Sequence, residues 1–231
     1  MTEARIEGTE ACVFDAYGTL LDFNSAVMHC REETGDSAER LSKIWRQKQL
    51  QYTWLRSLMG DHADFWQVTG EALDFSLAAV GIDNPKLRET LMALYRELDT
   101  FPDVSDALTR LKDAGMRTAI LSNGAPDMLN AAAAASGIDR LLDEILSVED
   151  VGVFKPDPKV YQLAVDRLGV AADRICFMSS NGWDAAGAAG FGFKVAWINR
   201  YGQPVEHLPA RPDVELDSLA ALPAILGLEN T

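Results

Sequence analysis

The stretch Ala11-Cys12-Val13-Phe14-Asp15-Ala16-Tyr17-Gly18-Thr19-Leu20 is the best starting point for interpreting this chain of 231 residues. Its first four residues form a short apolar run, which is typical of a strand buried in a parallel sheet. The run stops at Asp15, so this carboxylate should lie at the carboxyl end of the strand. An isolated aspartate near a glycine is usually a turn residue, and its meaning therefore depends on the other strands.

Further apolar runs of strand length follow along the chain. They occupy residues 117–121, 175–178 and 194–198, with a weaker one at 145–148. Between them lie helical patterns at 105–114, 127–136 and 158–168, each followed at once by a glycine, the usual helix stop. Strands that alternate with helices predict an α/β fold with a Rossmann-like, doubly wound parallel sheet.

The interval 22–99 breaks this alternation, because it carries helical periodicity and no strand pattern. Apolar residues from Leu41 to Met59 fall roughly on one stripe, and two more helices are expected at 65–80 and 85–98. We interpret 22–99 as a helical cap inserted into a core domain made of residues 1–21 and 100–231. The alternative is a set of extra helices packed on the sheet without a cap role.

Polar motifs follow several of the expected strands. They are Ser122-Asn123-Gly124, Lys155-Pro156-Asp157-Pro158 and Ser179-Ser180-Asn181-Gly182-Trp183-Asp184. Ligands of open α/β sheets bind beyond the carboxyl ends of the strands. We therefore expect Asp15, Ser122, Lys155 and Asp184 to converge on one crevice. Each motif alone is weak evidence, and their coincidence in order is the argument.

These motifs resemble those of the haloacid dehalogenase superfamily over almost the whole chain. The segments 15–20, 155–158 and 179–184, with the cap run Trp45-Arg46-Gln47-Lys48-Gln49-Leu50 and Tyr52-Thr53-Trp54-Leu55-Arg56, look like the L-2-haloacid dehalogenases. The resemblance implies hydrolysis of short (S)-2-haloalkanoic acids to (R)-2-hydroxy acids and halide. The reaction would pass through an ester of Asp15 and invert the configuration at carbon.

Two departures from the phosphatases of this superfamily favour a dehalogenase. Tyr17 stands where those enzymes carry a second aspartate that protonates the leaving group, and a halide leaves without a proton. Ser179 and Ser180 stand where a carboxylate helps to hold Mg²⁺, so we expect neither metal nor cofactor. A Mg²⁺-dependent phosphatase, displacement of a non-halide leaving group in the same pocket, and a non-catalytic binding protein remain the alternatives.

The resemblance also implies roles for individual residues. Asp15 would be the nucleophile, Lys155 its counter-charge and Asp184, with Asn181, the group that activates water, although Lys155 remains an alternative base. Ser122, with main-chain amides around Tyr17 and Gly18, would hold the substrate carboxylate, while Thr19 would support Asp15. Arg46 would bind halide with Asn123. The remaining substrate-site positions are Gln47, Leu50, Phe65, Tyr161, Ser179, Ser180 and Trp183.

Composition sets broader limits on partners and location. The net charge of −14 disfavours nucleic acid, whose backbone needs clustered basic residues. No apolar run approaches the roughly 20 residues of a membrane span, and residues 1–5 lack a signal-peptide pattern. Cys12 and Cys176 lie in strand-like runs, as expected of reduced, buried thiols. We expect a cytoplasmic protein without membrane contact, acting on a small 2-haloacid, and the resemblance suggests a homodimer through cap helices.

Overall fold

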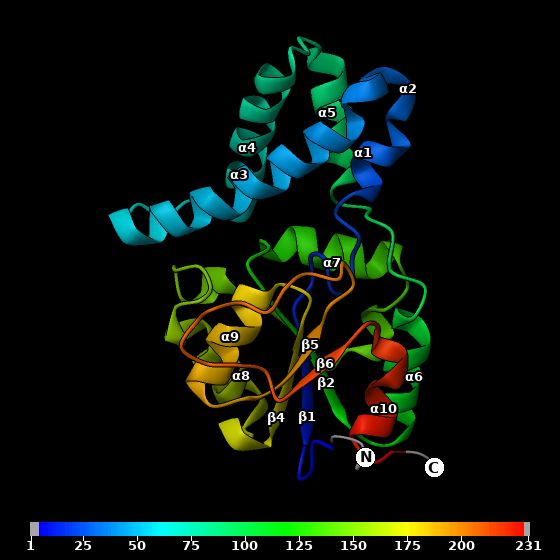
Figure 1. Ribbon diagram of the computed structural model, residues 1–231, viewed down its shortest axis with the longest axis vertical. Helices are drawn as coiled ribbons and strands as arrows, with labels where there is room; N and C mark the ends of the chain where they lie inside the picture. The colour runs from blue at the N-terminus through cyan, green and yellow to red at the C-terminus, as the bar shows by residue number, and fades with distance from the viewer. Residues whose placement is uncertain (1–4, 229–231) are drawn as a thin grey trace.

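The computed structural model describes residues 5–228; residues 1–4, where part of the signal-peptide prediction falls, lie outside the described residues. Its centre is a six-stranded parallel sheet in the order β3-β2-β1-β4-β5-β6 (Figure 1). The strands are β1 (Ala11–Phe14), β2 (Arg117–Ser122), β3 (Glu144–Ser147), β4 (Ile175–Ser179), β5 (Lys194–Ile198) and β6 (Val214–Leu216). The doubly wound parallel sheet is thus confirmed, and β6 is an edge strand that the sequence pattern did not indicate.

Helices cover both faces of this sheet. In Figure 1, α6 and α10 lie on one side, and α8 and α9 lie on the other. The core helices are α6 (Val104–Asp113), α7 (Pro126–Ala135), α8 (Pro158–Leu168), α9 (Gly182–Phe191) and α10 (Leu222–Ile225). The helix α8 has the bounds expected from the sequence, because its ends carry strong signals. The Asp157 side chain caps its start by accepting from the Lys159 amide, and Gly169 ends it in a left-handed conformation.

A separate helical layer, here called the α1–α5 unit, lies over the carboxyl ends of the strands (Figure 1). It consists of α1 (Ser25–His29), α2 (Arg31–Thr34), α3 (Ala38–Met59), α4 (Phe65–Val80) and α5 (Pro85–Leu94). The two segments that join it to the core are hydrogen-bonded neighbours. Leu21 pairs with Thr100 in an antiparallel bridge, and the Asp22 amide donates to the Asp99 carbonyl at 2.8 Å.

The long helix α3 buries a different face from the one that its apolar pattern predicted. Its buried residues are Ala38, Leu41, Ser42, Trp45, Gln49 and Thr53. Leu55 and Met59, expected on the same stripe, are exposed. Figure 1 shows the reason, because the carboxyl end of α3 extends beyond the rest of its layer. The buried face is chosen by the helices that pack on it, mainly α4, and includes polar residues.

Two further expectations concern the environment of the chain. Cys12 and Cys176 are free and buried, in agreement with the sequence interpretation, and so is Cys30. Within residues 5–228, no helix combines the length and the apolar character that crossing a membrane requires.

Candidate active site

The predicted site residues meet where the order of the strands reverses, between β1 and β4. Asp15 directly follows β1, and its amide donates to the Met178 carbonyl of β4 at 2.8 Å. Neighbouring helices connected on opposite faces leave a crevice at such a switch point, which is where ligands bind in open α/β sheets. Only 5% of Asp15 is exposed, so its carboxylate depends on protein groups for its hydrogen bonds.

Both oxygens of the Asp15 carboxylate have partners. The Lys155 ammonium group lies 3.1 Å from Oδ1, and the Asn181 side-chain amide donates to Oδ2 at 2.8 Å. The Thr19 hydroxyl also points to Oδ2, at a longer distance of 3.5 Å. These contacts fix the orientation of the carboxylate and give its negative charge a direct counter-charge.

Lys155 also binds a second carboxylate. It is 1% exposed, and its ammonium group lies 2.8 Å from Asp184 Oδ2. The other Asp184 oxygen accepts a 2.8 Å hydrogen bond from the Tyr161 hydroxyl. Burial raises the pKa of Asp184, the charge of Lys155 opposes this rise, and the charge of Asp15 adds to it. The two aspartates and the lysine therefore form one coupled, buried group.

Ser179, at the end of β4, and Ser180, in the loop after it, bind residues that contact Asp15. The Ser180 amide donates to the Thr19 hydroxyl at 2.8 Å, and the Ser179 hydroxyl accepts from the Asn181 amide at 3.1 Å. Both serines thus act on residues that contact Asp15. The resemblance placed Ser179 and Ser180 at the substrate site, and that role stays a prediction.

Ser122, the last residue of β2, and Asn123, the first residue after it, lie at the same edge of the sheet. The Asn123 side-chain oxygen accepts from the Lys155 main-chain amide at 3.0 Å, which ties this loop to the one that carries the lysine. The Ser122 hydroxyl accepts from the Gly124 amide at 3.1 Å. It keeps its own proton available as a donor.

The motif residues Tyr17 and Gly18, which follow Asp15, also have partners within the protein. The Gly18 amide donates to the Leu21 carbonyl at 2.7 Å, so it is engaged within its own loop. The Tyr17 ring packs between Phe65 and Tyr95, with centroid separations of 5.5 and 5.4 Å. Burial raises the pKa of Tyr17 well above its usual value, which keeps its hydroxyl neutral.

Arg46 reaches the site from α3. Its guanidinium group donates to the Tyr17 carbonyl at 3.2 Å and to the Asn181 side-chain oxygen at 3.4 Å. It also lies 5.0 Å from the centroid of the Phe23 ring. Arg46 therefore links the α1–α5 unit to the residues around Asp15, and it places a cation above the crevice.

The two glutamines that follow Arg46 behave differently. Gln47, which the resemblance placed at the substrate site, is exposed. Gln49 is buried and accepts from the Arg46 guanidinium at 2.8 Å. Its amide group donates to the Thr69 hydroxyl at 2.8 Å and to the Tyr95 hydroxyl at 3.0 Å. Gln49 was not predicted as a site residue, although its spacing of three from Arg46 places both on one helix face.

Two cavities of about 500 Å³ adjoin the site. One is lined by Gly18, Arg46, Leu50, Asn181 and Trp183, together with the loop from Tyr201 to His207. The other is lined mainly by apolar residues, among them Trp54, Leu58, Phe154 and Leu208, and it reaches Lys155. Trp183 lines both, and its ring meets that of Trp54 edge-on at 5.3 Å. Leu50 and Trp183, which the resemblance placed at the substrate site, thus line the cavity that contains Arg46.

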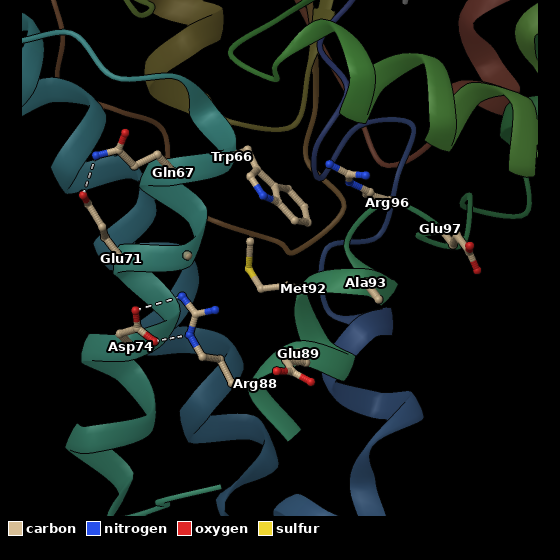
Figure 2. Close-up of a pocket in the computed structure, with 11 residues that line it drawn as sticks. Trp66, Gln67, Glu71, Asp74, Arg88, Glu89, Met92, Ala93, Arg96 and Glu97 are labelled. Atoms are coloured by element: carbon tan, nitrogen blue, oxygen red, sulfur yellow. Dashed lines mark hydrogen bonds and ion pairs between the residues drawn. The ribbon is translucent and has the colours of Figure 1, made fainter. Parts of the chain in front are cut away.

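A further cavity of about 610 Å³ lies between α4 and α5 and contains none of the predicted site residues (Figure 2). Its wall carries an ion pair between Asp74 and Arg88, and Glu71 accepts a 2.9 Å hydrogen bond from Gln67. These charged groups already have partners of their own.

Metal-binding side chains do not gather anywhere in residues 5–228: no group of three or more His, Cys, Asp or Glu residues lies close enough together to hold an ion. Asp15 and Asp184 are both bound to an ammonium group instead.

The fold and this site define the class of the protein. A family model described as haloacid dehalogenase-like hydrolase matches residues 9–192. The chain belongs to this family.

The more similar relatives have a narrower description. The (S)-2-haloacid dehalogenase 4A of Burkholderia cepacia is 50% identical over 227 residues, which cover 98% of each chain. A solved dehalogenase structure that is also 50% identical has a TM-score of 0.92, with 98% of each chain covered. The L-2-haloacid dehalogenase of Xanthobacter autotrophicus, solved with chloropropionic acid covalently bound, is 37% identical with a TM-score of 0.88; the match covers 94% of this chain and 98% of that one. These relatives confirm the resemblance to L-2-haloacid dehalogenases that the motifs indicated.

Proposed function

We propose that this protein hydrolyses short (S)-2-haloalkanoic acids to (R)-2-hydroxy acids and halide through an ester of Asp15. The observation that carries the proposal is the Asp15 carboxylate itself, buried at the switch point and bound by Lys155 and Asn181. A relative that holds chloropropionic acid covalently supports the covalent step.

In the first step, one Asp15 oxygen attacks the carbon that bears the halogen. The carbon–halogen bond breaks with its electron pair, so halide leaves as the ester bond forms. Attack from the side opposite the halogen inverts the carbon. Lys155 stabilises the carboxylate before attack, and the contacts to both oxygens limit its rotation.

In the second step, water attacks the carbonyl carbon of the Asp15 ester, and the bond to the original Asp15 oxygen breaks. The hydroxy acid leaves with that oxygen, and water replaces it in Asp15. We assign Asp184 the role of accepting the proton of this water, because Lys155 is already held by ion pairs to both aspartates. Asn181 would help to orient the water from its position on Asp15 Oδ2.

Arg46 is the proposed acceptor of the halide, since it is the cation that lies between α3 and the loop after β4. At the carboxyl end of β2, Ser122 is proposed to bind the substrate carboxylate and Asn123 to contact the halide. Leu50, Phe65 and Trp183 would exclude water around the alkyl group, which strengthens these ionic contacts.

We further propose that the reaction needs no metal ion. Tyr17 stands packed between two aromatic rings at the position of the phosphatase acid. Ser179, at the start of the last motif, is engaged with the Asn181 amide. These contacts support a site that uses Lys155 as its cation.

A single turnover in water enriched in oxygen-18, with enzyme in excess over (S)-2-chloropropionate, tests the covalent route. We expect label in Asp15 and unlabelled (R)-lactate. Labelled lactate from a first turnover would overturn the ester, and (S)-lactate would overturn the inversion. The R enantiomer of the substrate serves as the control and should release no chloride.

The cytoplasmic location and the homodimer stay predictions. For the dimer, the supporting observation is an exposed apolar end of α3, where Leu58 is 84% exposed beside Leu55 and Met59. Light scattering of the protein, with Leu58→Glu as the matched variant, tests it. A monomer in both samples would exclude this dimer, and a dimer in both would exclude this surface.

A further inference from the structure

Arg200 contacts the active-site loop from outside the residues to which the mechanism gives a role. It lies two residues beyond β5, and 8% of its side chain is exposed. Its guanidinium group donates to the Thr19 carbonyl through two nitrogens, Nε at 3.2 Å and an Nη at 2.9 Å. Thr19 lies in the turn after Asp15, where its carbonyl has left the strand ladder. A buried carbonyl without a partner would be costly, and Arg200 supplies that partner.

The carboxylate that pairs with Arg200 is that of Asp103. Asp103 precedes α6 at the position where an aspartate usually caps the helix, yet its side chain makes no capping hydrogen bond. One oxygen of Asp103 instead lies 3.0 Å from the Arg200 guanidinium and accepts from the Leu219 amide at 2.6 Å. The guanidinium also covers the Phe101 ring at 4.1 Å. Arg200 thus joins the Thr19 turn to the segment where the α1–α5 unit returns to the core.

Thr19 connects Arg200 to Asp15, because Arg200 binds the Thr19 carbonyl and the Thr19 hydroxyl faces the Asp15 carboxylate. Its hydroxyl accepts from the Ser180 amide at 2.8 Å and points to Asp15 Oδ2 at 3.5 Å. A shift of the Thr19 main chain would therefore move a group that touches the carboxylate and would loosen the loop after β4. Displacements of about 1 Å at such a site cost up to about a hundredfold in rate.

We propose that Arg200 is a positioning residue that holds Thr19, and through it Asp15, in the geometry needed for attack. This inference rests on the proposed function for its kinetic consequence, but its structural part is independent of that function. Removal of the guanidinium should slow formation of the Asp15 ester more than it weakens substrate binding.

The test compares Arg200→Ala and Arg200→Lys with Arg117→Ala, measured as single-turnover and as steady-state halide release from (S)-2-chloropropionate. Arg117 is the matched control, because it also donates to a main-chain carbonyl, that of Leu168, at the opposite end of the sheet. We expect Arg200→Ala to lower the rate of halide release about tenfold to a hundredfold, with KM within about twofold of the wild-type value. Added guanidinium ion should restore part of the rate, and Arg200→Lys should lie in between. Unchanged halide release, or an unchanged kcat with a raised KM, would overturn the proposal.

Amide hydrogen exchange provides a second measurement that does not need activity. The Ser180 amide, which donates to Thr19, should exchange faster in Arg200→Ala and Arg200→Lys but not in Arg117→Ala. Equal protection of Ser180 in all of these proteins would overturn the positioning role. A wild-type protein that releases no halide, with Ser180 exchange changed as expected, would instead remove the proposed function and leave the positioning role standing.

Discussion

The Tyr161 hydroxyl donates a 2.8 Å hydrogen bond to Oδ1 of Asp184, and both side chains are buried. Since the other Asp184 oxygen is bound to Lys155, each oxygen of this carboxylate has its own partner. The ring of Tyr161 is in turn packed against Phe177 and Phe193 at 6.0 Å. The orientation of Asp184 is thus controlled from a helix, α8, that carries no other proposed catalytic group.

The variant Tyr161→Phe tests the consequence for pH dependence. The Tyr161 hydrogen bond lowers the pKa of Asp184, so its removal should raise that pKa. Because ester hydrolysis needs ionised Asp184, the acid limb of the kcat profile should move to higher pH, and kcat should fall about tenfold. A kcat profile from pH 4 to 9 provides the measurement. Tyr52→Phe, on α3, is the control, and an acid limb that stays in place would contradict the assignment of Asp184 as the base.

The glycines of α9 offer a second way to disturb the same contact. A Cβ atom at Gly187 would lie 2.5 Å from the Tyr161 hydroxyl and 2.8 Å from Pro156 Cβ. Gly187→Ala should therefore lower the free energy of unfolding by about 1–3 kcal/mol and reduce kcat as Tyr161→Phe does. Gly190→Ala is the matched control, since its Cβ would meet Ala210 at 3.6 Å. The free energy of unfolding in urea and kcat should both be reduced in Gly187→Ala and not in Gly190→Ala. Equal stability and equal kcat in the two variants would exclude a steric role for Gly187.

Replacing Lys155 should make stability strongly dependent on pH. Lys155→Met removes the charge that opposes the burial-raised pKa of Asp184, leaving two buried carboxylates without a cation. A pKa raised on folding means that stability is retained below the unfolded value of 3.8 and lost as pH rises through the folded value. We expect the variant to be about 3 kcal/mol less stable than the wild type at pH 8, with a smaller difference near pH 4.5. Urea unfolding at both pH values measures this. A deficit that is the same at both would show that the pair contributes by packing alone.

Gln49 and Gln47 form a natural pair for testing the halide site. Gln49→Leu removes the acceptor of Arg46, so chloride should inhibit the variant several-fold more weakly, a change of about 1 kcal/mol in binding. Gln47→Leu changes an exposed side chain and should leave chloride inhibition as it is. The inhibition constants for chloride in both variants show which of the two glutamines supports chloride binding. A larger effect at Gln47 would favour the position that the family resemblance indicated.

Metal removal should leave the reaction unaffected. Prolonged treatment with excess EDTA followed by desalting should not change kcat or KM for (S)-2-chloropropionate, and added Mg²⁺ should not raise either. Hydrolysis of p-nitrophenyl phosphate, measured in parallel with Mg²⁺, should stay at background. Loss of halide release on chelation, recovered by Mg²⁺, would contradict the proposed counter-charge role of Lys155.

The central strands could be predicted because their residues are buried on both faces, which makes each a continuous apolar run. The edge strand β6 has three residues, none of which is fully buried and the middle one of which is exposed, so its sequence carries no such run. The convergence of Asp15, Lys155 and Asp184 was also predictable, since each follows a strand or its connecting loop on the same edge of the sheet. The partner of each carboxylate oxygen was not, because it depends on side-chain geometry.

The residues missed by sequence reasoning act through other residues. Gln49 bonds Arg46, and Arg200 bonds a main-chain carbonyl, so neither stands in a motif next to a reacting group. The buried face of α3 shows a related limit. Periodicity marks where apolar residues recur, whereas packing against α4 selects a face that also contains Gln49 and Thr53.

The pairing of Leu21 with Thr100 places the entrance and the exit of the α1–α5 unit side by side. The two chain segments that enter and leave the unit are therefore as close together as the ends of a short loop, whatever the length or content of the unit. Exchanging the unit for another would replace Arg46 and Leu50, while β1, which Asp15 follows, would keep its neighbours β2 and β4. The side chains that bind the Asp15 carboxylate, those of Lys155 and Asn181, thus lie in the core, whereas Arg46 is carried by a segment whose two ends meet.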